Sequence, residues 1–296
     1  MLERPQLLFQ LPGPVFGDVP SPEISAKGCL EYALLGLAFT FVNVLLVSAT
    51  APPRERQRRQ LYVIQQFPVT LSIIVVRWAI YVSARHISFA AWLLSHPLNV
   101  FEAVHMQWNA DRFEGRAPKG ADFRAMRLCI KASFVEMMAV TFLHRIQEPW
   151  IQSGAPAAAP LMRAACGMSL LFDLSVDTVF YPMHRASHEY RQLYRWIHRD
   201  HHTDTGHEGT EGGQHLLAWE TYAISWIELF LISAGYGLGF AVIIWAYGDV
   251  FDLFSLSLLV TWAHLIELLG HTSMGWTMHG NPLSCLLYTS DAADEE

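Results

Sequence analysis

The stretch LMRAACGMSLLFDLSVDTVFYPMHRASHEYRQLYRWIHRDHH, residues 161–202, joins a long apolar run to a dense group of histidines. Its first part, Leu161–Met183, has about the 20 residues that an α-helix needs to cross a bilayer. Its second part carries five histidines at spacings that suit a helix. The stretch therefore predicts an apolar helix that opens at its end into a polar, histidine-rich segment.

Further apolar runs of nearly membrane-spanning length lie on both sides of this stretch. The clearest, Leu30–Thr50, is followed by the basic run Arg54–Arg59, which the positive-inside rule assigns to the cytosol. Only Gly248 and Asp249 separate the last two runs, which predicts a tight transmembrane hairpin. The remaining runs are Leu128–Leu143, Tyr222–Tyr247 and Val250–Leu269.

One more apolar segment, Pro68–Leu94, is interrupted by Arg77, Arg85 and His86. Two short helices, a re-entrant hairpin and an interfacial segment are all compatible with this pattern. The sequence alone does not choose between them.

Arginines on both sides of the pair of runs Leu128–Leu143 and Leu161–Met183 indicate the orientation of this pair. Arg124 and Arg127 precede the run Leu128–Leu143, and four more arginines follow Met183. Both flanks are expected in the cytosol. Since the hairpin that follows returns to the same side, all the histidine-rich segments should share the cytosolic compartment.

Composition supports a membrane protein. The chain is 52% hydrophobic and 16% charged, whereas soluble domains carry about 25% charged residues. Buried helices of a large soluble protein are the alternative, but so many long runs are hard to bury in one core of this size. We therefore predict an all-α, polytopic helical membrane protein.

The charge balance and the cysteines exclude other classes. The net charge of −7 falls to about −3 without the four acidic residues at the C-terminal end, which argues against a nucleic-acid partner. None of the four cysteines has the paired spacing of a thiolate zinc site or of a disulfide framework.

The histidines form two groups with helical spacing. His184 and His188 are four residues apart and share a helix face, and so do His198, His201 and His202. Protonated imidazoles brought this close would repel one another, whereas neutral imidazole is an excellent ligand for iron, zinc or copper. A solvated histidine-rich tract is the alternative, but the surrounding residues are patterned rather than of low complexity. The spacing predicts a metal site.

Supporting residues are expected on neighbouring helices. Asp177 lies on the same helical face as the first histidine pair, and could ligate a metal, accept a hydrogen bond from a ligating histidine, or be solvated at a helix end. Downstream, His264 and His271 share a face of the last apolar run, and we expect His271 to be a ligand and His264 a supporting residue. Glu220 and Glu228 open the preceding run, and we expect Glu220 to be the supporting carboxylate.

The motifs H-R-x-x-H and L-Y-x-x-x-H-x-x-H-H within 177–202 closely resemble the fatty acid hydroxylase/sterol desaturase superfamily of membrane-bound histidine-box oxygenases. The resemblance covers roughly residues 161–282, and it implies a helical membrane fold under a cytosolic, histidine-rich cap that holds two metals. It implies that six histidines bind metal, and carrying them over by position gives His184, His188, His198, His201, His202 and His271.

The resemblance also implies an activity. It implies an oxidoreductase with two iron ions, with zinc as a substitute, that uses O2 to hydroxylate or desaturate a sterol or fatty acyl-type lipid. Electrons would come from NAD(P)H through cytochrome b5 and its reductase. The chain has no heme-binding His-Pro-Gly-Gly motif, so the carrier should be a separate protein. A multi-pass position in the endoplasmic reticulum membrane is implied as well.

One departure from the family concerns the C-terminal end. The family has a second H-x-x-H-H box beyond the position of His271, and this chain has none. The sequence after Ser284 instead looks like a translated sequencing adaptor, so we expect a truncated chain. The expected regions are a loose leader at 1–29, membrane segments at 30–127, an incomplete catalytic domain at 128–284 and a non-native tail at 285–296.

Two other functions stay open. The first is a histidine-rich membrane protein that binds or transports metal, which would need ligands deep within several spans. The second is a catalytically inactive homologue, which the missing histidine box makes plausible.

Overall fold

The structure is a computed structural model that describes residues 34, 53–83, 88–113, 115, 117–118, 120, 122–147, 158–199, 201, 217–247 and 253–272. Most of these residues are helical, and none of them forms a β-strand. The all-α part of the predicted fold class is therefore confirmed for this portion of the chain.

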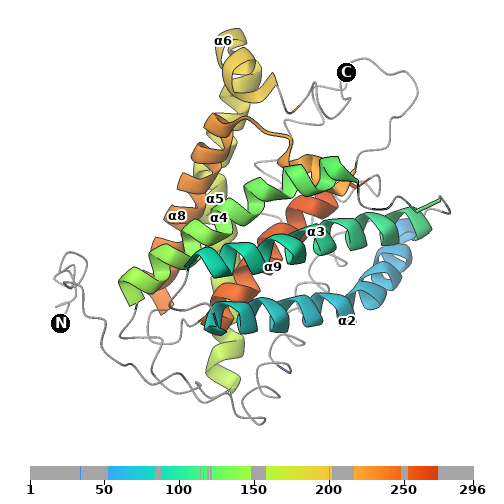
Figure 1. The fold of residues 1–296 in the computed structure, drawn as a ribbon, viewed down its shortest axis with the longest axis vertical. Helices are drawn as coiled ribbons and strands as arrows, with labels where there is room; N and C mark the ends of the chain where they lie inside the picture. The colour runs from blue at the N-terminus through green and yellow to red at the C-terminus, as the bar shows by residue number, and fades with distance from the viewer. Residues whose placement is uncertain are drawn as a thin grey trace.

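The described residues form six long helices and three short helical segments (Figure 1). The long helices are α2 (Pro53–Ser83), α3 (Ser88–Phe113), α4 (Phe123–Gln147), α5 (Ala158–Glu189), α8 (Trp226–Tyr247) and α9 (Leu253–Gly270). The short segments are α6 (Arg191–Leu193), the π-helical turn η2 (Tyr194–His198) and the 3-10 helix η3 (Ala218–Tyr222).

Local signals explain several helix ends. Gly115, with a φ of 73°, follows α3 and donates its N–H to the carbonyl oxygen of Arg112, so it ends the helix in a conformation that suits glycine. Asp122 caps α4 by accepting the N–H of Ala125 at 2.7 Å. Ser225 caps α8 by accepting the N–H of Glu228 at 3.1 Å.

The long helices pack as two groups. The helix α5 runs the length of the molecule with α8 along its side, and α2 and α3 lie across this pair (Figure 1). The helix α3 packs between α2 and α4, and α9 packs mainly on α2. The end of α5 that carries the histidines therefore projects beyond the crossing helices.

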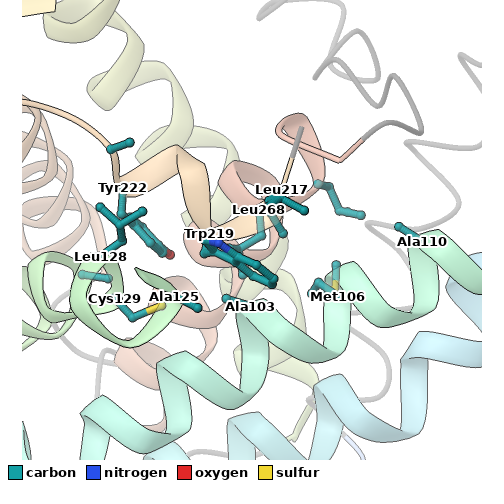
Figure 2. Close-up of a cluster of buried hydrophobic side chains, with 14 of the residues drawn as sticks. Ala103, Met106, Ala110, Ala125, Leu128, Cys129, Leu217, Trp219, Tyr222 and Leu268 are labelled. Carbon is teal, nitrogen blue, oxygen red and sulfur yellow. The ribbon is translucent and has the colours of Figure 1, made fainter. Parts of the chain in front are cut away.

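One hydrophobic core surrounds Trp219 of η3. Its fully buried indole lies among Ala103 and Met106 of α3, Ala125 of α4 and Leu268 of α9 (Figure 2). This core fixes η3, and with it the start of α8, against the C-terminal end of α9.

A second core joins α5 to α8 through two glycines. A Cβ atom on Gly235 would lie 3.3 Å from the carbonyl oxygen of Val176, and one on Gly239 would lie 2.8 Å from Cδ2 of Phe172. Glycines four residues apart let two helix backbones approach closely, a motif common between membrane helices. The absence of side chains here sets the distance between α8 and the histidine-bearing helix.

A buried polar network links four helices around Arg77 of α2, which is fully buried. Its guanidinium contacts Glu102 at 2.8 Å and Glu136 at 3.0 Å, and also donates to Thr261. Asn99 completes the set by accepting from Arg77 at 2.7 Å and donating to Glu136 at 2.7 Å. A buried arginine requires such partners, because its desolvation is otherwise very costly.

The apolar runs that fall within the described residues lie on helices. Within the described residues, one helix is long and apolar enough to cross a membrane, Trp226–Ala246. Two shorter apolar helices cover Pro68–Tyr81 and Leu253–Leu269. The run Leu30–Thr50 lies outside the described residues, apart from Leu34.

The structure also bears on the segment Pro68–Leu94 and on the hairpin expected around Gly248 and Asp249. The ambiguous segment Pro68–Leu94 belongs to two long helices, because α2 ends at Ser83 and α3 begins at Ser88. The hairpin expected around Gly248 and Asp249 has its turn outside the described residues, and its helices pack mainly on different neighbours, α8 on α5 and α9 on α2.

Candidate metal centre

Three imidazoles from two segments meet at the projecting end of α5. His184 and His188 come from its last two turns, and His198 comes from η2. Their ring centroids are 4.5–4.8 Å apart, and one ligand nitrogen from each lies within 4.8 Å of the others. We call these three residues the histidine triad. The triad could hold a metal ion.

The π-helical turn explains how His198 reaches the triad. Between Tyr194 and His198 the backbone winds more widely than an α-helix, a feature often found at functional sites. His198 is buried there, whereas the aromatic side chain of Trp196 within the same turn is exposed. The turn thus directs His198 back toward α5.

A second pair of imidazoles lies beside the triad. Nε2 of His201 and Nε2 of His271 are 3.4 Å apart, although the residues are separated by 70 positions in sequence. The ring of His201 also stacks on that of His198, with centroids 5.2 Å apart. We call His201 and His271 the histidine pair. Five of the six predicted ligands therefore lie in one continuous cluster, and the sixth, His202, is outside the described residues.

Two of the nitrogen–nitrogen distances in the cluster suit a metal site. Nε2 of His184 and Nε2 of His188 are 3.3 Å apart, close to the 3.4 Å of the histidine pair. Nitrogen–nitrogen distances above about 3.2 Å are long for a hydrogen bond. In a tetrahedral site with metal–nitrogen bonds of about 2.0–2.1 Å, two ligand nitrogens lie about 3.3–3.4 Å apart.

Hydrogen bonds to the second ring nitrogen fix the tautomer of two of these histidines. Nδ1 of His198 donates to Oε1 of Glu228 at 2.8 Å, and both side chains are almost completely buried. Nδ1 of His271 donates to the main-chain oxygen of Glu267 at 3.0 Å. In each case the Nε2 lone pair is left to face the cluster, which is the arrangement of metal-binding histidines in general.

The carboxylate that contacts the cluster is Glu228, whereas the expected one is Glu220. Glu220, expected as the supporting carboxylate, accepts the N–H of Leu217 at 3.1 Å and lies 3.4 Å from Arg124, so it caps η3. Glu228 contacts His198 instead. The chain forms η3 before α8 begins, and this break moves Glu220 out of the helix that Glu228 opens.

The other two supporting candidates lie elsewhere. Nδ1 of His264 is 3.2 Å from Arg77 and 3.4 Å from Glu102, so His264 belongs to the Arg77 network. It is two helical turns, about 10 Å, before His271. Asp177 is buried on α5, and it precedes His184 by the same two turns.

A sequence signal could have identified Glu228. Ser225-Trp-Ile-Glu228 has the S-x-x-E pattern that marks the start of a helix. The structure has Ser225 as the cap, although the Glu228 side chain turns to His198. The apolar run Tyr222–Tyr247 includes the end of η3 and all of α8, so hydropathy alone does not mark the start of α8.

Comparisons with known proteins found no matching family model, no matching curated protein and no matching solved structure.

Proposed function

We propose that this chain is a membrane-bound, histidine-ligated di-iron oxygenase that oxidises C–H bonds of a lipid, by hydroxylation or by desaturation. The observation that carries the proposal is the cluster of five imidazoles, in which a triad and a pair present facing nitrogens side by side. The residue patterns that resemble the fatty acid hydroxylase/sterol desaturase superfamily supply the reaction class.

Two metal positions follow from the grouping of the nitrogens. His184, His188 and His198 would hold one ion, and His201 and His271 would hold the second. Iron bound there would supply the activation of O2 that removes hydrogen from an unactivated carbon. Neutral imidazoles suit this chemistry because they leave coordination positions open and add no charge.

Position relative to the apolar helices supports a lipid substrate. The candidate span Trp226–Ala246 begins two residues before Glu228, so the cluster lies at one end of that helix. The outer face of α8 exposes large apolar side chains, among them Phe230 and Trp245. A substrate that enters from the acyl-chain region would therefore approach the cluster along α8. A multi-pass position in the endoplasmic reticulum and electron supply by NAD(P)H, cytochrome b5 and its reductase are part of the same proposal.

Metal transport is the less favoured function. A transporter would need metal ligands deep within its helix bundle. The deep polar group in the described helices is centred on Arg77, whose own cationic guanidinium occupies the position between Glu102 and Glu136. The histidine cluster instead lies at the projecting end of α5.

Metal content and product formation test the proposal together. The full chain, purified in detergent and reconstituted with iron, should retain close to two ions, and His188→Ala should lose at least one of them. His105→Ala is the matched control, because His105 stacks between Phe101 and Trp108 on α3, away from the cluster. With NADPH, cytochrome b5, its reductase and mixed lipids, the loaded chain should give products 16 Da heavier or 2 Da lighter.

Each result separates the candidate functions. Bound iron with no product under any lipid mixture would favour an inactive homologue. Metal that crosses a sealed vesicle in the presence of the chain would favour transport. A chain that retains no stoichiometric iron or zinc would refute the metal centre itself.

A further inference from the structure

A buried carboxylate, Glu228, is hydrogen-bonded to the histidine triad. Its Oε1 accepts the Nδ1 proton of His198 at 2.8 Å. The two side chains are 1% and 2% exposed, so water does not compete for this bond. Glu228 is itself held by its place in the first turn of α8, where Ser225 accepts its main-chain N–H at 3.1 Å.

Burial makes this bond strong and directional. A hydrogen bond with an ionised acceptor is about twice as strong as one between neutral groups, and it strengthens further where the surroundings are of low polarity. The bond fixes His198 with its proton on Nδ1 and its lone pair on Nε2. It also places a negative charge behind the ring, which increases the basicity of the ligating nitrogen.

The histidine pair has a different support. Nδ1 of His271 donates to the carbonyl oxygen of Glu267 at 3.0 Å, which is a neutral acceptor. This bond fixes the tautomer of His271 as well, but it adds no charge behind the ring.

From this contrast we infer that the two metal positions are unequal and fill in order, the triad first, and that Glu228 is the positioning residue that makes the triad the tighter of the two. The inference rests on the proposed function only in its assumption that two metal ions are bound. A cation at the triad would be attracted by the Glu228 carboxylate through His198. A cation at the histidine pair would gain no such support from Glu267.

The test is a titration of the full, detergent-solubilised, metal-free chain with Zn²⁺ alone against a chromophoric chelator. The unaltered chain should bind Zn²⁺ in two resolved steps. Glu228→Ala should weaken the first step about 10- to 100-fold, the usual effect of removing a partner that orients a ligating histidine, and leave the second step unchanged. Glu228→Gln, which keeps the shape and one acceptor oxygen, should weaken the first step less.

Two further variants make the assignment specific. His271→Ala should remove the second step and leave the first in place. Glu189→Gln is the matched carboxylate control, since Glu189 lies on α5 beside His188 but pairs with exposed Arg185, and it should change neither step. With Co²⁺ as a probe, the absorption spectrum of the first equivalent should change in Glu228→Gln and not in Glu189→Gln. A purely structural role for Glu228 would not produce this spectral difference in a folded variant.

The outcomes distinguish this inference from the proposed function. Equal weakening of both steps by Glu228→Gln, or no weakening of either, would overturn the inference while leaving a two-metal centre in place. Two equivalent sites in the unaltered chain would do the same. A complete lack of metal binding would overturn the proposed function with it. Circular dichroism of each variant identifies loss of fold as the cause of any change.

Discussion

The close approach of α5 and α8 leads to a prediction about two neighbouring glycines. A Cβ atom on Gly239 would lie 2.8 Å from Cδ2 and 3.0 Å from Cε2 of Phe172, whereas one on Gly237 would meet nothing within 4 Å. Phe172 cannot move aside easily, because it is buried and its ring packs on Phe240 with centroids 5.0 Å apart. Gly239→Ala should therefore be strained, and Gly237→Ala should not.

The expected magnitude follows from two opposing effects. Replacing a helical glycine by alanine stabilises by about 0.5–1 kcal/mol. Overpacking a well-filled core costs about 1–3 kcal/mol. Gly237→Ala gains the first effect alone, so it should be slightly more stable than the unaltered chain. Gly239→Ala carries both effects, so the two variants should differ by about 1–3 kcal/mol, with Gly239→Ala the less stable.

The assay is reversible denaturation of each detergent-solubilised variant, followed by tryptophan fluorescence, with zinc content as a second readout. Because α8 also carries Glu228, displacement of α8 by Gly239→Ala should lower metal affinity, and Gly237→Ala should leave it unchanged. Equal stability of the two variants would refute the argument. So would a Gly239→Ala protein that is more stable than Gly237→Ala, because the tight contact with Phe172 would then not exist.

Three further predictions concern the helices that support the centre. Arg77→Leu should lower the free energy of unfolding by about 3–5 kcal/mol, because Glu102 and Glu136 stay buried without their cation. Arg185→Leu is the control, because it alters an exposed pair, and its thermal midpoint should hardly change. Trp219→Ala should cost about 3–5 kcal/mol by leaving a cavity in the first core, measured by denaturant titration, and a loss below 1 kcal/mol would contradict its central position. Asp122→Ala should cost about 1 kcal/mol through loss of the α4 cap, and Asp122→Asn should restore most of it.

Part of the candidate metal centre can be predicted from the sequence, because that part depends on local geometry. His184 and His188 lie on one face of α5 because any α-helix brings positions four apart together. The spacing also indicated that His198 and His201 would lie close together. It does not predict that they contact different partners, because these partners are distant in sequence. His198 contacts His184 and His188 of α5. His201 contacts His271, which follows α9.

The supporting residues were harder to predict, because their partners are distant in sequence. Arg77 interrupts an apolar run, and nothing near it indicates that it pairs with Glu136, 59 positions away. The spacing of His264 to His271 predicts a supporting role at the histidine cluster. In the structure His264 instead contacts Arg77 and Glu102. Glu220 is predicted as the supporting carboxylate, whereas Glu228 contacts His198 in the structure. Hydropathy alone does not separate η3 from α8. Periodicity describes one helix at a time, and these contacts form between helices.

The helix α8 contacts α5 closely at Gly239, near its middle, and carries Glu228 in its first turn. Glu228 is eleven residues before Gly239, which is about 16 Å along the axis. A swing of only about 5° about the glycine contact would move the carboxylate by about 1.4 Å, enough to stretch a 2.8 Å bond beyond the hydrogen-bonding range. A small rotation of α8 at the glycine contact therefore produces a large displacement of the Glu228 carboxylate. The geometry of the Glu228–His198 bond thus depends on helix packing about 16 Å away along α8.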